Sequence, residues 1–251
     1  MAGVRKAISA NRALVLDTLY FARSVPSFSV ERTFELKGLA ALRQASPVRI
    51  SWPVLFLKAY AQVVAEQPLL RQIYLPWPWP HLYESSETTA ALAIAREFEQ
   101  VERLCWGCFQ NPATTPLVEL QIVLDHFQHW RVDDVFRRQV RLSRLPAWLR
   151  RIAWRIGLYL NVSKRTKRFG TFSLSSLAGQ GVLNRSHPTI HTTSLTYGPV
   201  DASGNCLVTL LCDHRVIDGL AAARALNYLE DVLRGDIATE LADLAQCRAA
   251  A

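Results

Sequence analysis

A histidine followed four residues later by an aspartate and then by a glycine gives this sequence its clearest chemical signal. His214, Asp218 and Gly219 lie in the stretch CDHRVIDG, at residues 212–219. Imidazole ordinarily has a pKa near ~6.5, so a well-positioned histidine can remove a proton at neutral pH. The same pattern also suits a packed structural histidine, or two ligands of a metal ion.

A metal site is the weaker of these interpretations. No third ligand lies at a helpful spacing from the motif. His187 and His191 are four residues apart, but Pro188 and the β-branched residues after it do not favour one helical face. We therefore expect no bound metal.

Two regular elements flank the motif and would position it. The apolar run CLVTLL at 206–211 predicts a strand that ends just before the histidine. An alanine- and leucine-rich run at 220–234 predicts a helix that stops at Gly235. The histidine would thus be held at the end of a stiff strand.

In this setting DHRVIDG resembles the HxxxDG signature of the CoA-dependent acyltransferases. That family includes chloramphenicol acetyltransferase and the dihydrolipoyl acyltransferase cores of 2-oxo-acid dehydrogenase complexes, and the longer string is similar to the latter branch. The stretch FGTFSLSSLAGQG at 169–181 is similar to the Gly-Thr-Phe-x-x-Ser-Asn-Leu-Gly segment of the same branch. By position, Ser175 matches the serine that stabilises the tetrahedral intermediate. Ser176 and Ala178 depart from the pattern, which leaves the acyl and acceptor specificity open.

The N-terminal region carries a third match. Family members open with an Arg-Lys pair, a helix and a proline before a strand, and here Arg5-Lys6 and Pro26 stand in that order. In the family the first arginine pairs with the aspartate of the motif, so the resemblance implies an ion pair between Arg5 and Asp218. Without the family resemblance, Arg5 would be interpreted as a solvated charge, and Ser175 would be interpreted as one of several hydroxyl residues on a strand.

The resemblance implies a fold and a reaction. We expect a single α/β domain like chloramphenicol acetyltransferase, with a mixed β-sheet flanked by helices. His214 would be the general base and Ser175 the oxyanion stabiliser, moving an acyl group from acyl-CoA to a thiol or hydroxyl acceptor. Any lipoyl group would be on a separate carrier. A homotrimer is also implied, with histidine and serine coming from neighbouring subunits. The competing hypothesis is a non-catalytic trimeric scaffold or a membrane-associated assembly protein.

Length and composition are compatible with this interpretation. The 251 residues suffice for one large α/β domain, and we expect residues 1–251 to be the catalytic domain, without lipoyl or peripheral-subunit-binding domains. Five cysteines without a secretory leader favour a cytoplasmic location. The CWGC motif formed by Cys105 and Cys108 has no supporting context and is taken as buried or incidental. No stretch has the ~20 apolar residues of a membrane-spanning helix.

The net charge of +8 is concentrated in one segment. Residues 131–168 contain twelve Lys or Arg and two Asp, so the rest of the chain is nearly neutral. Within it, LPAWLRRIAWRIGLYL at 145–160 places apolar residues on one helical face, with Arg150, Arg151, Arg155 and Trp154 away from the centre of that face. Such a helix suits peripheral membrane contact, but we favour a helix packed on the core with its arginines in water or near CoA phosphates. No nucleic-acid-binding motif accompanies the charge.

Elsewhere the sequence predicts elements without chemistry of their own. The family resemblance is weak between residues 71 and 168. The motif PWPWP at 76–80 is rigid, and we take it as a loop whose tryptophans cap the core rather than a recognition element. Periodicity predicts helices at 4–22, 39–45, 52–67 and 116–130, and strands at 27–36, 88–95, 98–109 and 192–197.

Overall fold

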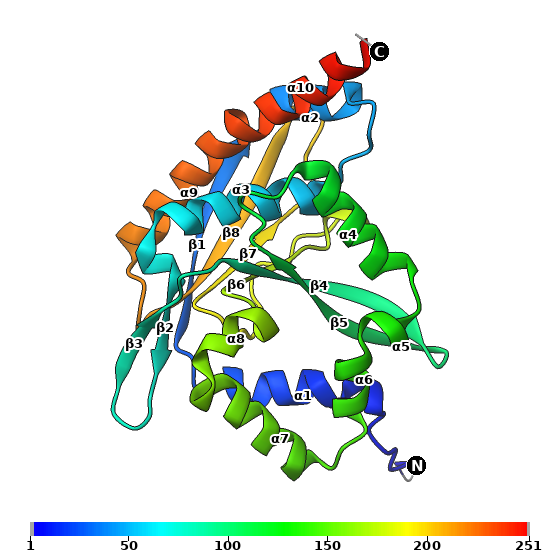
Figure 1. Cartoon of the computed structure of the whole chain (residues 1–251), viewed down its shortest axis with the longest axis vertical. Helices are drawn as coiled ribbons and strands as arrows, with labels where there is room; N and C mark the ends of the chain where they lie inside the picture. The colour runs from blue at the N-terminus through cyan, green and yellow to red at the C-terminus, as the bar shows by residue number, and fades with distance from the viewer. Residues whose placement is uncertain (1–2, 250–251) are drawn as a thin grey trace.

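Six strands form the mixed sheet at the centre of the computed structural model, which describes residues 3–249 (Figure 1). Their order across the sheet is β1-β8-β7-β6-β4-β5. The β7–β6 and β6–β4 pairs are parallel, and the other neighbours are antiparallel. The strands are β1 (Ser27–Glu35), β4 (Thr89–Phe98), β5 (Val101–Gln110), β6 (Phe172–Ser175), β7 (Thr193–Tyr197) and β8 (Asn205–Asp213).

Helices cover both faces of this sheet, which confirms the predicted single α/β domain (Figure 1). One face is covered by α2 (Lys37–Ala45), α3 (Trp52–Glu66), α4 (Leu117–His129), α9 (Gly219–Arg234) and α10 (Asp236–Ala249). The opposite layer contains α1 (Ala10–Ala22), α6 (Arg137–Ser143), α7 (Ala147–Arg155) and α8 (Val162–Phe169). The remaining helical pieces are η1 (Pro68–Arg71), α5 (Val132–Val135), the π-helical turn η2 (Ile156–Leu160) and η3 (Ala178–Gln180).

The main hydrophobic core lies between the sheet and helices α3 and α9. Helix α3 is buried along most of its length, as its nearly continuous apolar sequence predicts. Phe56 stacks on Tyr197 with centroids 4.1 Å apart, and Tyr60 meets Phe172 edge-on at 4.9 Å. Each such pair adds about 0.5–1.5 kcal/mol beyond area burial, so this face contributes much of the stability.

Strand β8 is held along its whole length. It pairs with β1 from Asn205 to Asp213 on one side and with β7 on the other. Directly after the strand, the backbone N–H of His214 donates to the carbonyl oxygen of Pro26 at 2.9 Å. The backbone at the histidine is therefore fixed on the central sheet.

Two expectations about local structure were wrong. The first helix begins at Ala10 rather than at residue 4, because Val4 and Ile8 are exposed and find no surface to pack against. The PWPWP segment does not cap the core. It forms the tip of a hairpin between β2 (Gln72–Leu75) and β3 (His81–Glu84), and Trp77 and Trp79 are largely exposed.

Helix α7 also packs differently from the expected orientation. Its buried side chains are Arg150 and Trp154, which were expected away from the packed face. The Arg150 guanidinium pairs with the fully buried Asp17 of α1, with Nη2 3.3 Å from Oδ1, and Trp154 stacks on Phe21 at 5.7 Å. The exposed residues of α7 and η2 instead include the apolar side chains Trp148, Leu149, Ile152, Ile156 and Leu160.

The buried ion pair gives a stability prediction. Arg150→Gln removes the cation that is hydrogen-bonded to the buried Asp17 carboxylate and leaves only the more distant Arg151 guanidinium, with Nε 3.8 Å from Oδ1, so we expect a loss of about 3 kcal/mol in the free energy of unfolding. Arg155→Gln is the matched control, because Arg155 lies exposed on the same helix and should change stability by about 0.5 kcal/mol or less. Urea denaturation measures both, and equal small losses would contradict a stabilising role for the pair.

Candidate active site

His214 lies at the point where β8 ends and the chain turns toward α9. Its ring rests against Phe28 of β1, with centroids 4.6 Å apart, and its side chain is 56 % exposed. Nδ1 lies 3.6 Å from Oδ1 of Asp218, the residue that precedes α9. This distance is too long for a hydrogen bond, but it is close enough for an electrostatic contact.

The residues on either side of the histidine secure the turn. Arg215 donates to the Asp213 carboxylate through Nη2 at 2.6 Å and through Nε at 2.9 Å. Its guanidinium also lies over the Tyr74 ring, 4.3 Å from the centroid. Asp213 and Arg215 are not among the predicted site residues, although their opposite charges flank the histidine in the sequence. The pair holds the backbone on which His214 sits.

Gly219 is the first residue of α9. A Cβ placed there would meet no atom within 4 Å, and its backbone is outside the left-handed region. Contacts within residues 3–249 therefore do not explain why glycine stands at this position of the motif.

Ser175 ends β6, two strands away from β8. In the sheet register Ser175 pairs with Thr196 of β7, and Thr196 pairs with Thr209 of β8. His214 lies five residues beyond Thr209. At ~3.3 Å per residue along a strand and ~4.8 Å between strands, the Cα atoms of Ser175 and His214 are about 19 Å apart. One chain therefore does not bring both side chains to the same substrate atom.

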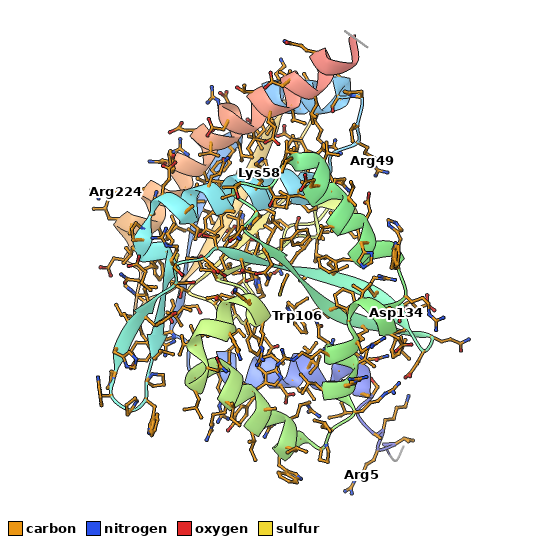
Figure 2. All side chains as sticks on the ribbon, viewed as in Figure 1. Arg5, Arg49, Lys58, Trp106, Asp134 and Arg224 are labelled. Atoms are coloured by element: carbon orange, nitrogen blue, oxygen red, sulfur yellow. The ribbon has the colours of Figure 1, made fainter. Side chains whose placement is uncertain are left out.

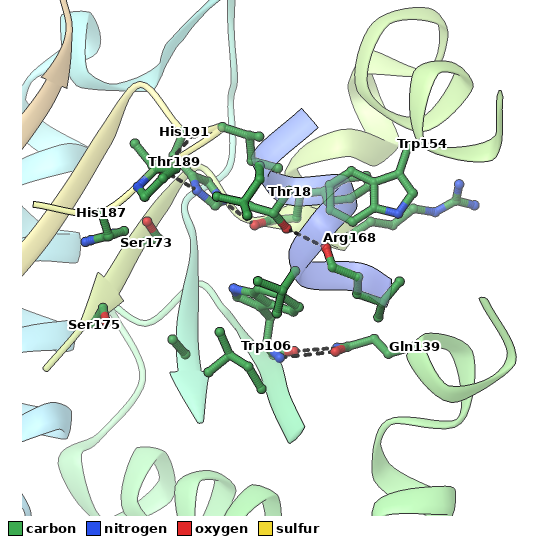
Figure 3. Close-up of a pocket in the computed structure, with 18 of the residues that line it drawn as sticks. Thr18, Trp106, Gln139, Trp154, Arg168, Ser173, Ser175, His187, Thr189 and His191 are labelled. Carbon is green, nitrogen blue, oxygen red and sulfur yellow. Dashed lines mark hydrogen bonds between the residues drawn. The ribbon is translucent and has the colours of Figure 1, made fainter. Parts of the chain in front are cut away.

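Ser175 faces a cavity of about 390 Å³ between the sheet and the helical layer formed by α1, α6, α7 and α8. Figure 3 shows Ser173, Ser175 and His187 on one side of this cavity, Trp154 and Arg168 on the other, and Trp106 between them. His214 is not part of the lining. The two predicted catalytic residues thus lie in different places on one chain.

A hydrogen-bonded chain of side chains backs the serine side of the cavity. Ser173 donates to Ser194 at 2.7 Å, and Ser194 lies 2.8 Å from Nε2 of His187. Burial lowers the pKa of His187, which keeps its ring neutral at neutral pH. No local pattern links His187 to Ser173, because their connection through Ser194 depends on the pairing of β6 with β7.

His191 ties the segment after β6 to the end of α8. Its Nε2 donates to the Phe169 carbonyl at 2.6 Å, and its Nδ1 lies 3.2 Å from the Thr189 hydroxyl. Burial lowers the pKa of His191 to about 4, with Arg165 adding to the shift. His187 and His191 therefore have separate hydrogen-bond roles, and among residues 3–249 no three His, Cys, Asp or Glu side chains are grouped to hold a metal ion.

Arg5 lies exposed in the extended segment before α1. Within the described part of the chain it makes no ion pair with Asp218, whose side chain is exposed and lies beside the His214 ring. The Arg5–Asp218 pair stays a prediction. The structure instead shows a contact between Asp218 and His214, which was not predicted from the sequence.

Solved structures share this fold at low sequence identity. One is the truncated catalytic core of the 2-oxoacid dehydrogenase multienzyme complex from Thermoplasma acidophilum, with a TM-score of 0.67, 14% identity and coverage of 93% of this chain and 99% of that one. A second is dihydrolipoamide acetyltransferase from Azotobacter vinelandii, with a TM-score of 0.66, 18% identity and coverage of 95% of both chains. A third is a probable dihydrolipoamide acetyltransferase from Listeria monocytogenes, with a TM-score of 0.65, 14% identity and coverage of 93% of this chain and 94% of that one.

These likenesses confirm the predicted fold. No protein-family model matches the sequence, and no curated protein matches it either. For the Azotobacter protein, the catalytic mechanism has been studied at a serine, a histidine and an asparagine four residues after that histidine. At this last spacing the present chain has Asp218.

The buried His191 predicts a pH-dependent stability. Its folded pKa of about 4 lies below the unfolded value of 6.5, so its contribution is present above pH 6.5 and is lost as the pH falls toward 4. Between pH 7.5 and pH 5 we expect a loss of about 2 kcal/mol in the free energy of unfolding from this group. Denaturation at both pH values should show a smaller difference for His191→Gln, and an unchanged difference would contradict this assignment.

Proposed function

We propose that this chain is an acyltransferase that moves an acyl group from acyl-CoA to a thiol or hydroxyl acceptor. The observation that carries the proposal is His214, held at the end of β8 in a fold shared with acetyltransferase cores. Ser175 on its cavity supplies the second group that such a reaction needs.

The reaction requires no covalent bond to the protein. Nε2 of His214 takes the proton from the acceptor S–H or O–H as the acceptor attacks the thioester carbonyl. The Ser175 hydroxyl donates a hydrogen bond to the oxyanion that forms, an interaction worth roughly 3 kcal/mol. When the tetrahedral intermediate collapses, its C–S bond breaks, and the CoA thiolate leaves with the proton held by His214. Asp218 lies on the Nδ1 side and stabilises the ring while it is charged.

The separation of the two groups makes assembly part of the mechanism. Because Ser175 and His214 lie about 19 Å apart in one chain, a common substrate needs His214 from one subunit and Ser175 from the next. A cyclic homotrimer offers three such sites through one repeated heterologous interface.

Mixed assemblies test this arrangement. His214→Ala should lower kcat by about 100-fold or more, and Ser175→Ala by about 100-fold. Co-expressing the two variants in equal amounts should restore about one quarter of wild-type activity, because random assembly gives that fraction of interfaces an intact histidine and an intact serine. The measurement is CoA release with a panel of acyl-CoAs and acceptors, free dihydrolipoamide included.

The controls separate the possible failures. Each variant alone must stay folded by circular dichroism. If the wild type transfers acyl groups but the mixture recovers nothing, the site between subunits is wrong. If the wild type releases no CoA from any pair of substrates, the scaffold hypothesis is favoured.

We also propose that α7 rests on an anionic membrane surface. Trp148, Ile152 and Ile156 form an outward apolar stripe, with Arg151 and Arg155 on the same exposed helix. The hairpin bearing Trp77 and Trp79 reaches the same end of the molecule as α7 in Figure 1. Tryptophan, aliphatic and arginine side chains together match the composition of interfacial helices.

No helix of the described chain is long and apolar enough to span a bilayer.

Vesicle sedimentation tests the membrane proposal. We expect the protein to bind vesicles of anionic lipid and to be released by high salt. Arg155→Gln should weaken binding about fivefold, since each basic residue near the surface contributes about 1 kcal/mol, and adding Trp148→Ser should weaken it further. Arg49→Gln removes the same charge from a helix-free position far from α7 and should have little effect (Figure 2). Absence of sedimentation with anionic vesicles would rule the proposal out.

A further inference from the structure

The cavity beside Ser175 arises from a difference between the two faces of the sheet. On β4, Ala90, Leu92 and Ile94 belong to the main core, whereas Ala93 lines the cavity. Since side chains alternate along a strand, Ala91 and Ala95 share the face of Ala93. On β6, Ser173 and Ser175 line the cavity and are equally small. Small side chains in neighbouring strands therefore leave space beneath the helical layer.

That layer closes the space with large apolar side chains. Leu14, Val15 and Leu19 come from α1, and Leu142 and Trp154 from α6 and α7. Leu104 and Trp106 of β5 complete the wall. Apart from the serine side, most of the lining is hydrocarbon, and Arg138 and Arg168 are the charged residues in it. A volume of about 390 Å³ lies within the range of small-molecule sites and is far larger than an acetyl group needs.

We propose that this cavity holds the hydrocarbon chain of the acyl group, so that the preferred donor carries a linear chain of medium length rather than acetyl. This inference rests on the proposed function. With the thioester carbonyl at Ser175, the chain would run past Trp106 toward Trp154, from the serine side of the cavity to the opposite side (Figure 3). An apolar chain there removes both its own surface and the cavity wall from water.

The positions of the two arginines define the main alternative. Arg138 and Arg168 both line the cavity, and burial, followed by the charge of Arg168, lowers the pKa of Arg138. Neither has an ion-pair partner among residues 3–249. A chain ending in a carboxylate would be attracted by them. A plain hydrocarbon chain fits the rest of the lining better, and the carboxylate-ended chain is an outcome that the test must distinguish.

A series of donors tests the proposal. Acetyl-, butanoyl-, hexanoyl-, octanoyl- and decanoyl-CoA are compared for CoA release by the assembled wild-type protein, together with a donor bearing a terminal carboxylate. We expect kcat/KM to rise about fourfold for each added methylene until the cavity is full, which corresponds to ~0.8 kcal/mol per buried methylene. A flat series, or a maximum at acetyl, would overturn the proposal. A preference for the carboxylate-ended donor over its plain counterpart would also overturn the proposal. It would indicate a site for carboxylate-ended chains, bound by Arg138 and Arg168.

Filling the cavity provides a matched pair of variants. Ala93→Phe places a ring in the space, so transfer from decanoyl-CoA should fall at least tenfold while transfer from acetyl-CoA changes less than threefold. Ala95→Phe adds the same ring two residues later on the same face of β4, at an exposed position outside the cavity lining, and should leave the whole series unchanged. Ala93→Leu serves where the phenylalanine variant does not fold.

A binding measurement separates this proposal from the proposed function. 1-Decanol, which has no carboxylate for the arginines to attract, is titrated into wild type, Ala93→Phe and Ala95→Phe by calorimetry. Binding to wild type and Ala95→Phe, with a negative heat-capacity change, and loss of binding in Ala93→Phe support the chain site even where no CoA is released. CoA release without 1-decanol binding and without a chain-length preference supports acyl transfer and overturns the chain site.

Discussion

The antiparallel pairing of β8 with both β1 and β7 is the constraint on which the rest of the molecule depends. It fixes nine residues of β8 against β1 and places His214 just beyond the sheet, where the chain must turn into α9. The β7–β8 register, together with the pairing of β6 with β7, aligns Ser175 with Thr209, about 19 Å from the histidine. A single geometric fact thus gives the histidine its rigidity and removes the serine from its reach within one chain.

Much of the layout around the motif could be predicted from local sequence. CLVTLL and the alanine-rich run after Gly219 gave the strand and helix beside His214, and the helix at 52–67 was correct within one residue. Such elements carry their own periodicity and boundary residues. The separation of Ser175 from His214 could not be predicted this way, because it depends on which strands pair and in what register. Those contacts join residues far apart in the chain.

Helix α7 shows where periodicity gives a misleading answer. Its apolar residues share a face, and by hydrophobic pattern that face should be buried. The structure buries the other face because Asp17 on α1 supplies a partner for Arg150, and Phe21 supplies an aromatic surface for Trp154. Neither partner is visible from residues 145–160 alone. A buried ion pair can therefore specify which side of a helix faces inward, even at little net gain in stability.

The two faces of the sheet differ in how completely side chains fill them. The α3–α9 face is filled with large side chains such as Phe56 and Tyr60, and their packing holds this side of the sheet. Opposite it, Ala93 and Ser175 leave a volume unfilled, which dense packing would not tolerate in a core. Ion pairing and aromatic stacking hold α7 on α1 without filling that space. Contacts between α7 and α1, together with hydrogen bonds that Arg103 of β5 donates to α1 and α6, thus hold the helical layer in place while the space beside Ser175 stays open.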